Sequence, residues 1–159
     1  QAGYQRIAYI AGWGGASTQR DREAGFREGL AAAGVQLFAR EEGDFHFEQA
    51  KLAARRMFSV DNRPDAVFVC NDYMAFAVMD VLRDEMQLRI PEDVAVVGYD
   101  DVPAAAWGAY KLTTVRQPAN RMVEETINTL LTQIEHDKAP PRRLSIDGPL
   151  VVRSTSLQP

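Results

Sequence analysis

The stretch DVAVVGYDD, residues 93–101, decides the fold of this chain. It begins with a nearly continuous apolar run that ends at Gly98, and the two acids Asp100 and Asp101 follow. Continuous apolar runs are typical of strands that helices cover on both faces of a parallel sheet, so we predict a strand over residues 93–98. Adjacent carboxylates repel each other, so at least one of the two acids should have a partner beyond the strand end.

Strands and helices alternate on both sides of this stretch. Three segments that precede it are typical of strands: the apolar runs RIAYIAG (6–12) and DAVFVC (65–70), and the alternating segment VQLFAR (35–40). Each is followed by residues with helical spacing, at 17–34, 47–58 and 74–86. Beyond it come a short strand, LTTV (112–115), a helix over 119–136, and two final runs, LSID (144–147) and LVVRSTS (150–156). This alternation predicts an α/β fold of three layers, αβα, around a mainly parallel sheet.

Composition limits the possible functions. The chain has 159 residues, a net charge of −4 and a pI near 5.2. Its lysines and arginines form no stripe, so we expect this segment alone to make no nucleic-acid contact. No apolar run approaches the length of about 20 residues that a membrane span requires. Cys70 is the single cysteine, which excludes a disulfide framework, and its place in the run AVFVC predicts a core residue.

Polar side chains gather where the predicted strands end. Ligands of open parallel sheets bind beyond the carboxyl ends of the strands. The residues at these ends are 12–18, 71–73 and 99–101. Arg22 shares the inward stripe of its helix with Phe26, so we expect its guanidinium in the crevice. The alternative is an arginine that buries its stem and extends its charged head into water.

Other features of this edge allow more than one interpretation. Phe45, after the second strand, could stack on a ligand or pack against the next helix. The glycines of GWGG (12–15) do not match a phosphate-binding motif and more simply permit a tight turn. A receiver-like phosphorylation switch keeps paired acids after its first strand, where this chain has glycines, so Mg²⁺ binding is poorly supported. We find no nucleophile with a base and no zinc motif, and we expect neither an enzyme nor a metal or cofactor site.

Six segments, taken in order, carry a resemblance to a known family. They are IAYIAG, the helix of Arg22, FVCNDYMA, IPEDVAVVGYDD, LTTVRQP and LVVRSTS. Together they resemble the effector-binding core of the LacI-type family of bacterial transcription regulators. The resemblance implies the C-terminal lobe of a periplasmic-binding-protein-like fold, formed by residues of about 4–111 and 149–159. Residues of about 112–148 would cross to an N-terminal lobe, and we expect most of that lobe and the DNA-binding helix-turn-helix to be absent from this chain.

The resemblance also implies ligand-binding residues: Arg22, Asn71, Asp100, Thr18, Phe45 and Gln117. The first three match positions that hold the effector in this family, and Gln117 matches a position near the cleft on the crossing segment. Two hydroxyls on neighbouring carbons can donate to one carboxylate, so a sugar-like ligand suits this set. For Asp101 we expect a structural role, such as capping the following turn, and direct contact with the ligand is the alternative.

The function that the resemblance implies is the effector-sensing and dimerisation portion of a cytoplasmic repressor. A small hydroxylated metabolite, a sugar or a sugar-like molecule, would modulate DNA binding by the full-length protein. Operator DNA would be contacted only through the absent N-terminal domain. A periplasmic sugar-binding protein of a transport system has the same fold and is the alternative.

Two helices have apolar faces that need cover. The helix at 74–86 is apolar nearly all round, and the resemblance assigns its outer face to a homodimer contact. The candidates for this contact are Phe76, Met79, Asp80 and Arg83. A helix that is simply well buried is the alternative. The helix at 119–136 has an apolar stripe, which we expect to pack against a neighbouring copy, to fold back on the sheet or to be loosely ordered.

Overall fold

A computed structural model describes residues 3–135, 140 and 143–156 of the chain and shows one six-stranded sheet, in the order β2-β1-β3-β4-β5-β6. Strands β1 to β5 are parallel, and β6 pairs with β5 in the antiparallel direction. The strands are β1 (Ile7–Ala11), β2 (Ala39–Glu42), β3 (Ala66–Val69), β4 (Ala95–Asp100), β5 (Thr113–Arg116) and β6 (Leu150–Val151). The predicted α/β fold with a mainly parallel sheet is confirmed.

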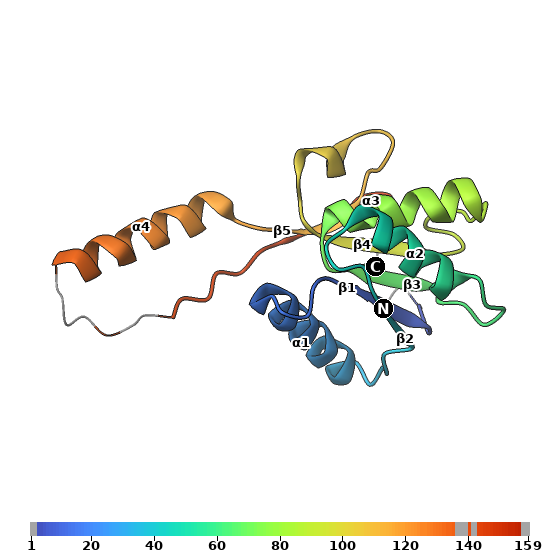
Figure 1. Ribbon diagram of the computed structural model, residues 1–159, viewed down its shortest axis with the longest axis horizontal. Helices are drawn as coiled ribbons and strands as arrows, with labels where there is room; N and C mark the ends of the chain where they lie inside the picture. The colour runs from blue at the N-terminus through green and yellow to red at the C-terminus, as the bar shows by residue number, and fades with distance from the viewer. Residues whose placement is uncertain (1–2, 136–139, 141–142, 157–159) are drawn as a thin grey trace.

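Helices lie on both faces of this sheet. Figure 1 shows α2 and α3 above it and α1 below it, while α4 extends away to the left. The helices are α1 (Ser17–Ala32), α2 (Phe47–Phe58), α3 (Asp72–Asp80) and α4 (Ala119–Glu135). Helix α3 continues into a π-helical turn, η1 (Val81–Glu85), and a short 3₁₀ helix, η2 (Pro103–Ala106), follows β4. The arrangement gives the three predicted layers.

The core lies between the sheet and the layer of α2 and α3. Helix α2 presents Ala50, Ala53 and Ala54 to the inside, and all three are fully buried, so the backbone of this helix lies close to its neighbours. Helix α3 contributes larger side chains, among them Met74 and Met79. Cys70 is buried in the same cluster, as predicted. This face of the domain is closely packed.

The edge strand β2 differs from its prediction. The alternating pattern at 35–40 predicted a strand, but the strand begins at Ala39 and includes the acids Glu41 and Glu42. An edge strand pairs on one side only, here with β1, and one of its faces can stay in water. Glu41 is tolerated there because its carboxylate pairs with Arg56 of α2 at 2.8 Å.

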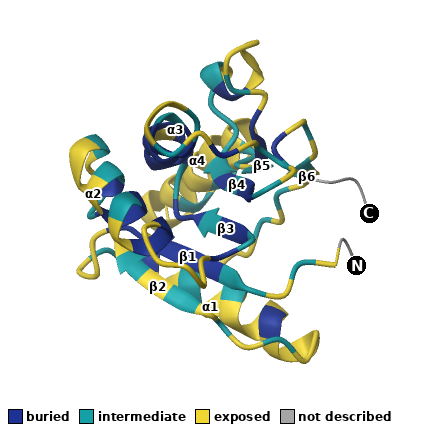
Figure 2. Ribbon diagram, turned by 90° about the vertical axis from the view of Figure 1, so that its right-hand side faces the viewer, coloured by how far each residue is buried: buried dark blue, intermediate teal, exposed yellow. Residues whose placement is uncertain are grey.

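The face of the sheet that carries α1 is only partly covered. Phe26 of α1 packs against Tyr9 and Phe68, with ring centroids 5.4 and 4.9 Å apart. Beside this contact lies an open cavity of about 610 Å³ over β3, β4 and β5. Its apolar lining includes Val67, Val97 and Val115. In Figure 2, α1 lies under β1 and β2 and leaves the β4 side of this face without a helix.

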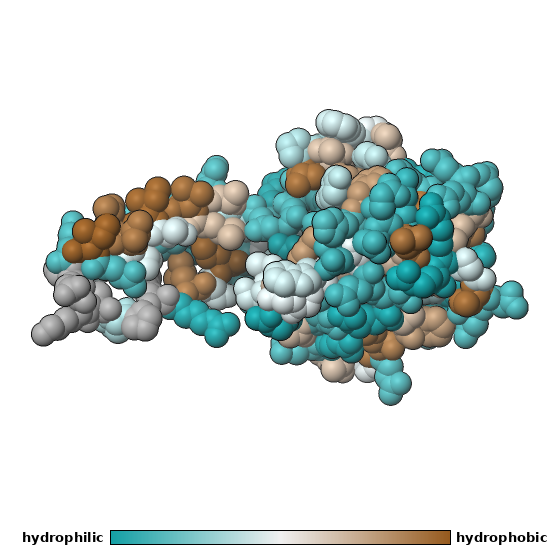
Figure 3. Space-filling view, in the orientation of Figure 1, coloured by the Kyte–Doolittle hydropathy of each residue, from teal (hydrophilic) through white to brown (hydrophobic). Residues whose placement is uncertain are grey.

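Helix α4 forms an arm that projects from the domain (Figure 1). None of its 17 residues is buried, although all of them are described. Figure 3 shows apolar side chains in a continuous band on one side of the arm. The helix does not fold back on the sheet, which removes one of the three expected arrangements. The sheet extends through β5 to Arg116, and the arm begins after this strand.

Candidate ligand-binding site

Three segments that are distant in sequence meet at the carboxyl end of β4. Arg22, in the second turn of α1, donates from Nη2 to Oδ1 of Asp100 at 3.1 Å. Its Nη1 donates to the carbonyl oxygen of Cys70 at 2.7 Å, which ties the guanidinium to the end of β3. Gln117, just after β5, donates from Nε2 to the same Oδ1 of Asp100. The structure thus brings together Arg22, Asp100 and Gln117, three of the six residues expected to bind the ligand, whereas Asn71, expected beside Arg22 and Asp100, makes no hydrogen bond to either of them among the described residues.

The guanidinium of Arg22 is held on a third side by an aromatic ring. Its central carbon lies 4.0 Å from the ring centroid of Tyr99, a cation–π contact. The Arg22 side chain is 14% exposed and that of Asp100 is 23% exposed, so this ion pair lies at the surface but is largely removed from water. A pair in this setting is ordered before a ligand arrives.

Asp100 retains the capacity to accept further hydrogen bonds. Its Oδ1 accepts from Arg22 and Gln117, whereas its Oδ2 accepts from none of the residues that the structure describes. Burial raises the pKa of Asp100, and the hydrogen bonds from Gln117 and Arg22 oppose this shift. Ligand hydroxyls that donate to Oδ2 would replace the hydrogen bonds with water that the carboxylate loses on burial.

Asn71 and Asp72 have structural roles that the sequence did not separate. The Oδ1 of Asn71 caps α3 by accepting from the backbone N–H of Met74 at 3.0 Å, so its amino group is the part left to donate. Asp72 is fully buried and accepts from the hydroxyl of Thr114 at 2.6 Å and from the N–H of Val102 at 3.0 Å. Burial raises the pKa of Asp72. Asp72 therefore holds β5 and the loop after β4 together beneath the site.

Gly98, which opens the GYDD motif, is required by Asp72. A Cβ at position 98 would lie 2.3 Å from Oδ1 of Asp72 and 2.8 Å from a methyl carbon of Leu112. Any larger residue would therefore displace the buried carboxylate. The motif combines a close backbone approach with the acid that follows it.

Asp101 accepts hydrogen bonds from two arginines and does not cap the following turn. Arg116 donates from Nε at 2.6 Å and Arg153 from Nη2 at 2.7 Å. The Asp101 side chain is only 5% exposed, and burial disfavours its charge, but the two arginines hold its pKa below the ordinary value. No side chain caps η2, although Asp72 accepts from the N–H of Val102 just before it. The two adjacent acids thus have different partners on opposite sides of the strand end.

The loops after β1 and β2 lie against each other near this site. Phe45 adopts a positive φ of 59°, and its ring covers Gly12 so closely that a Cβ there would lie 2.2 Å from it. The ring also packs against the core. Thr18 is exposed on the first turn of α1. Neither residue contacts the Arg22–Asp100 pair through a hydrogen bond among those of the described residues.

Gln19 is a residue that the sequence analysis missed. It is 1% exposed, and its Oε1 accepts from the N–H of Gly12 at 2.8 Å and from the hydroxyl of Tyr9 at 3.0 Å. It therefore fixes the start of the glycine loop beside the site. Glutamine is usually a surface residue. The only signal in the sequence is that position 19 belongs to the inward stripe of α1, where an apolar residue is expected.

The structure also shows where the four residues expected at a homodimer contact lie. Phe76 stacks on Tyr110 with centroids 4.2 Å apart, and Arg83 donates to the carbonyl oxygen of Ala109 at 2.5 Å. Asp80 is partly exposed, but Met79 has no exposed surface and belongs to the core.

Among the described residues, no cluster of three His, Cys, Asp or Glu side chains could hold a metal ion, and no helix is long and apolar enough to cross a bilayer.

Comparison with known proteins assigns this arrangement to a class. Residues 1–156 match the family described as a periplasmic binding protein-like domain, and the chain belongs to that family. The lac repressor dimer bound to operator and the anti-inducer ONPF aligns with a TM-score of 0.90 at 30% identity, over 99% of this chain and 54% of that one. A complex of the transcriptional regulator CelR with cellobiose aligns with a TM-score of 0.88 at 36% identity, over 97% and 47%.

Curated relatives narrow the class to LacI-type regulators. The repressor PurR of Photobacterium profundum is 31% identical over 96% of this chain and 46% of its own length. The ribose operon repressor of Escherichia coli is 35% identical over 97% of this chain and 47% of its own length. The chain thus corresponds to the effector-binding region of these regulators and spans about half the length of the relatives it matches.

Proposed function

We propose that this chain is the effector-sensing and dimerisation portion of a LacI-type repressor and that it binds a small hydroxylated metabolite. The observation that carries the proposal is the meeting of Arg22, Gln117 and Asp100 around one carboxylate whose second oxygen is available. In the full-length protein, effector bound at this edge would shift the equilibrium between operator-binding states. The known relatives are repressors, so the transport-protein alternative is not favoured.

The chemistry of the site suits a sugar-like ligand. A carboxylate accepts from two neighbouring hydroxyls, the amino group of Asn71 donates, and Arg22 only donates. An analogue that lacks one hydroxyl leaves a partner unpaired, at a cost of about 1–3 kcal/mol. Cellobiose, a ligand of this chemistry, is bound in the CelR complex, whose sequence is 36% identical to this chain. Thr18 and Phe45 complete the proposed set of contacts from the α1 and β2 side.

Several properties of the whole protein follow as parts of this proposal. Residues of about 112–148 would cross to an N-terminal lobe, and the effector would lie between the two lobes. Operator DNA would be bound by a separate N-terminal domain, and the protein would act in the cytoplasm without catalysing a reaction. The relatives' greater length leaves room for both additional parts.

A thermal-shift screen on the full-length protein tests the ligand assignment. Sugars, sugar acids and nucleobases are compared on the natural protein, on Asp100→Ala and on Asp61→Ala, an exposed acid in another loop. We expect a hydroxylated ligand to stabilise the natural protein and the Asp61 variant, and to lose most of its shift in the Asp100 variant. An unchanged shift with Asp100→Ala would show that the site lies elsewhere.

The outer side of α3 is the proposed dimer contact. Asp80 and Arg83 keep exposed surface, the buried Phe76 stacks on the Tyr110 ring, and the neighbouring Trp107 is exposed. Met79 would support this surface from within the core. Sedimentation of the full-length protein over a dilution series should show a dimer, and Arg83→Glu should shift dissociation to higher protein concentration by about 10-fold. A monomer at high concentration would contradict the dimer.

A further inference from the structure

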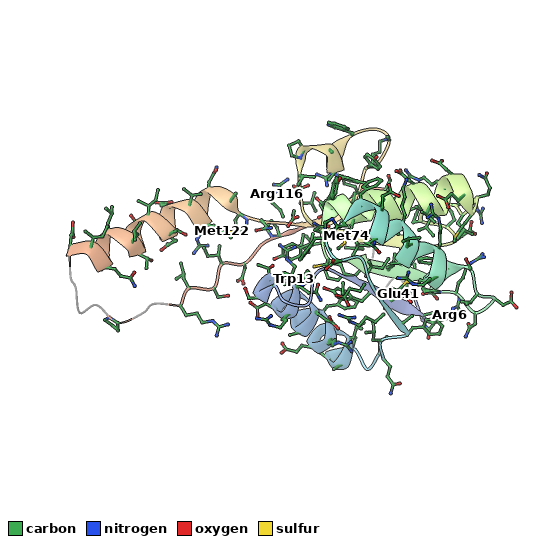
Figure 4. All side chains as sticks on the ribbon, viewed as in Figure 1. Arg6, Trp13, Glu41, Met74, Arg116 and Met122 are labelled. Carbon is green, nitrogen blue, oxygen red and sulfur yellow. The ribbon has the colours of Figure 1, made fainter. Side chains whose placement is uncertain are left out.

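Asp101 joins the two strands that carry the chain to the arm and back. Arg116 is the last residue of β5, which leaves the sheet toward α4, and Figure 4 shows it where the arm meets the domain. Arg153 follows β6, on which the chain returns. Both guanidiniums donate to Asp101, at 2.6 and 2.7 Å, and Arg153 also donates to the carbonyl oxygen of Leu112 at 2.7 Å. One buried carboxylate therefore connects the outgoing and returning segments.

The two strands themselves are closely paired at this point. The N–H of Arg116 donates to the carbonyl oxygen of Pro149 at 2.9 Å, and Val115 lies opposite Leu150. A Cβ at position 148 would lie 2.1 Å from the carbonyl oxygen of Arg116, so only glycine permits this approach. Any rotation of a part attached beyond the arm must turn about this pair of strands. Asp101 lies at its base.

Asp101 is also coupled to the proposed ligand-binding carboxylate. It directly follows Asp100, and the two residues adopt positive φ values of 129° and 56°, which are unfavourable for residues other than glycine. The N–H of Gln117 donates to the carbonyl oxygen of Asp100 at 3.3 Å, one residue after Arg116. A shift of the Asp101–arginine contacts would therefore move Asp100 and Gln117 together.

We propose that Asp101 is a positioning residue that sets Asp100 and Gln117 for the effector by clamping both crossing strands to the end of β4. The inference rests on the proposed function of the Asp100 site. The clamp does not touch the ligand. It holds the unfavourable backbone of the two acids and the start of the crossing segments in a single arrangement.

The test compares two acids at opposite ends of β4 in the full-length protein. Asp101→Asn removes the clamp, and Asp93→Asn is the matched control, because Asp93 accepts three hydrogen bonds from Arg89 just before the strand. Both variants should lose stability. The affinity for the effector found in the screen, measured by calorimetry, should fall by about 10-fold in Asp101→Asn and change less than about 2-fold in Asp93→Asn.

Arginine variants separate the clamp from a general loss of structure. Arg153→Gln should reproduce the affinity loss of Asp101→Asn, and the double variant should bind no more weakly than the more affected single one. Arg116→Gln should give a smaller loss in a protein that still folds, because the Arg116 side chain is half exposed and lacks the additional contact that Arg153 makes with the carbonyl oxygen of Leu112. Additive losses in the double variant would overturn the clamp.

The outcomes distinguish this inference from the proposed function. Equal effector affinity in Asp101→Asn and Asp93→Asn, together with lost binding in Asp100→Ala, would overturn the clamp and leave the ligand site in place. Unchanged binding in Asp100→Ala would overturn both, because Asp101 is inferred to act through Asp100.

Discussion

Helices α3 and α4 are both rich in apolar residues but differ completely in burial. Seven of the nine residues of α3 are buried between the sheet and its neighbours, whereas all 17 residues of α4 retain exposed surface. The exposed apolar side chains of α4 are Met122, Val123, Ile127, Leu130, Leu131 and Ile134. An amphipathic pattern therefore predicts a helix and which of its faces is apolar. Whether that face is buried depends on the presence of a partner surface.

The exposed apolar stripe of α4 is buried by none of the residues that the structure describes. Apolar surface left in water forgoes about 25 cal/mol per Å² of stabilisation, and patches of this kind mark interaction surfaces. The relatives are about twice as long as this chain, which agrees with an N-terminal lobe as the covering surface in the proposed full-length protein. Three pairs of substitutions test the contrast between the packed domain and the arm.

The largest effect is expected for a matched pair of methionines. Met79→Ala in α3 removes a fully buried side chain and should lower the free energy of unfolding of this chain by about 3 kcal/mol. Met122→Ala in α4 should change it by less than about 0.5 kcal/mol, because the side chain already contacts water. Urea denaturation followed by circular dichroism measures both. Similar losses in the two variants would show that α4 packs against a surface in solution.

A pair of glycines tests the junction between the two regions. Gly148→Ala should lower the free energy of unfolding by about 2 kcal/mol, because its Cβ would collide with the Arg116 carbonyl and separate β5 from β6. Gly108→Ala is the control, since nothing lies within 4 Å of a Cβ there. Amide exchange at Arg116 should accelerate only in the Gly148 variant. Retained protection would mean that the strands tolerate a wider separation.

The smallest effects concern the two adjacent acids, whose pKa values shift in opposite directions. Burial raises the pKa of Asp100 above its ordinary value of 3.8, so ionisation of this acid costs stability as the pH rises through the folded pKa. The arginines lower the pKa of Asp101 against the effect of burial, so its charge stabilises the fold above pH 3.8 and this contribution disappears as the pH falls through the folded pKa.

Replacing each acid in turn by its amide tests whether the two charges have opposite effects on stability. At pH 7, Asp101→Asn should lower the free energy of unfolding by about 1 kcal/mol, and Asp100→Asn should raise it by no more than about 1 kcal/mol. Both differences should vanish when the pH is low enough to protonate the two acids in the folded and unfolded states. Urea titrations at pH 7 and in acid provide the comparison, and changes of the same sign at pH 7 would contradict it.

Local signals in the sequence predicted the sheet, whereas most of the candidate ligand-binding residues came from the resemblance to the LacI-type family. Apolar runs followed by helical spacing gave β1, β3 and β4, and the inward stripe of α1 placed Arg22 correctly beside Asp100. The strand β2 was misplaced because the alternating pattern indicated residues 35–40, whereas the edge strand Ala39–Glu42 carries charged residues. The roles of Gln19 and Asp101 depend on partners that are distant along the chain, such as Arg153. The spacing of residues within one segment cannot predict such distant partners.

The two borders of the sheet restrict how copies of this protein can associate. At one border β2 carries Arg40, Glu41 and Glu42, and at the other β6 has only two residues. Charged or very short outer strands discourage a further strand from another molecule from adding to the sheet, a common route to fibrous aggregates. The chain can therefore expose an apolar arm and an open cavity while its backbone offers little template for uncontrolled polymerisation.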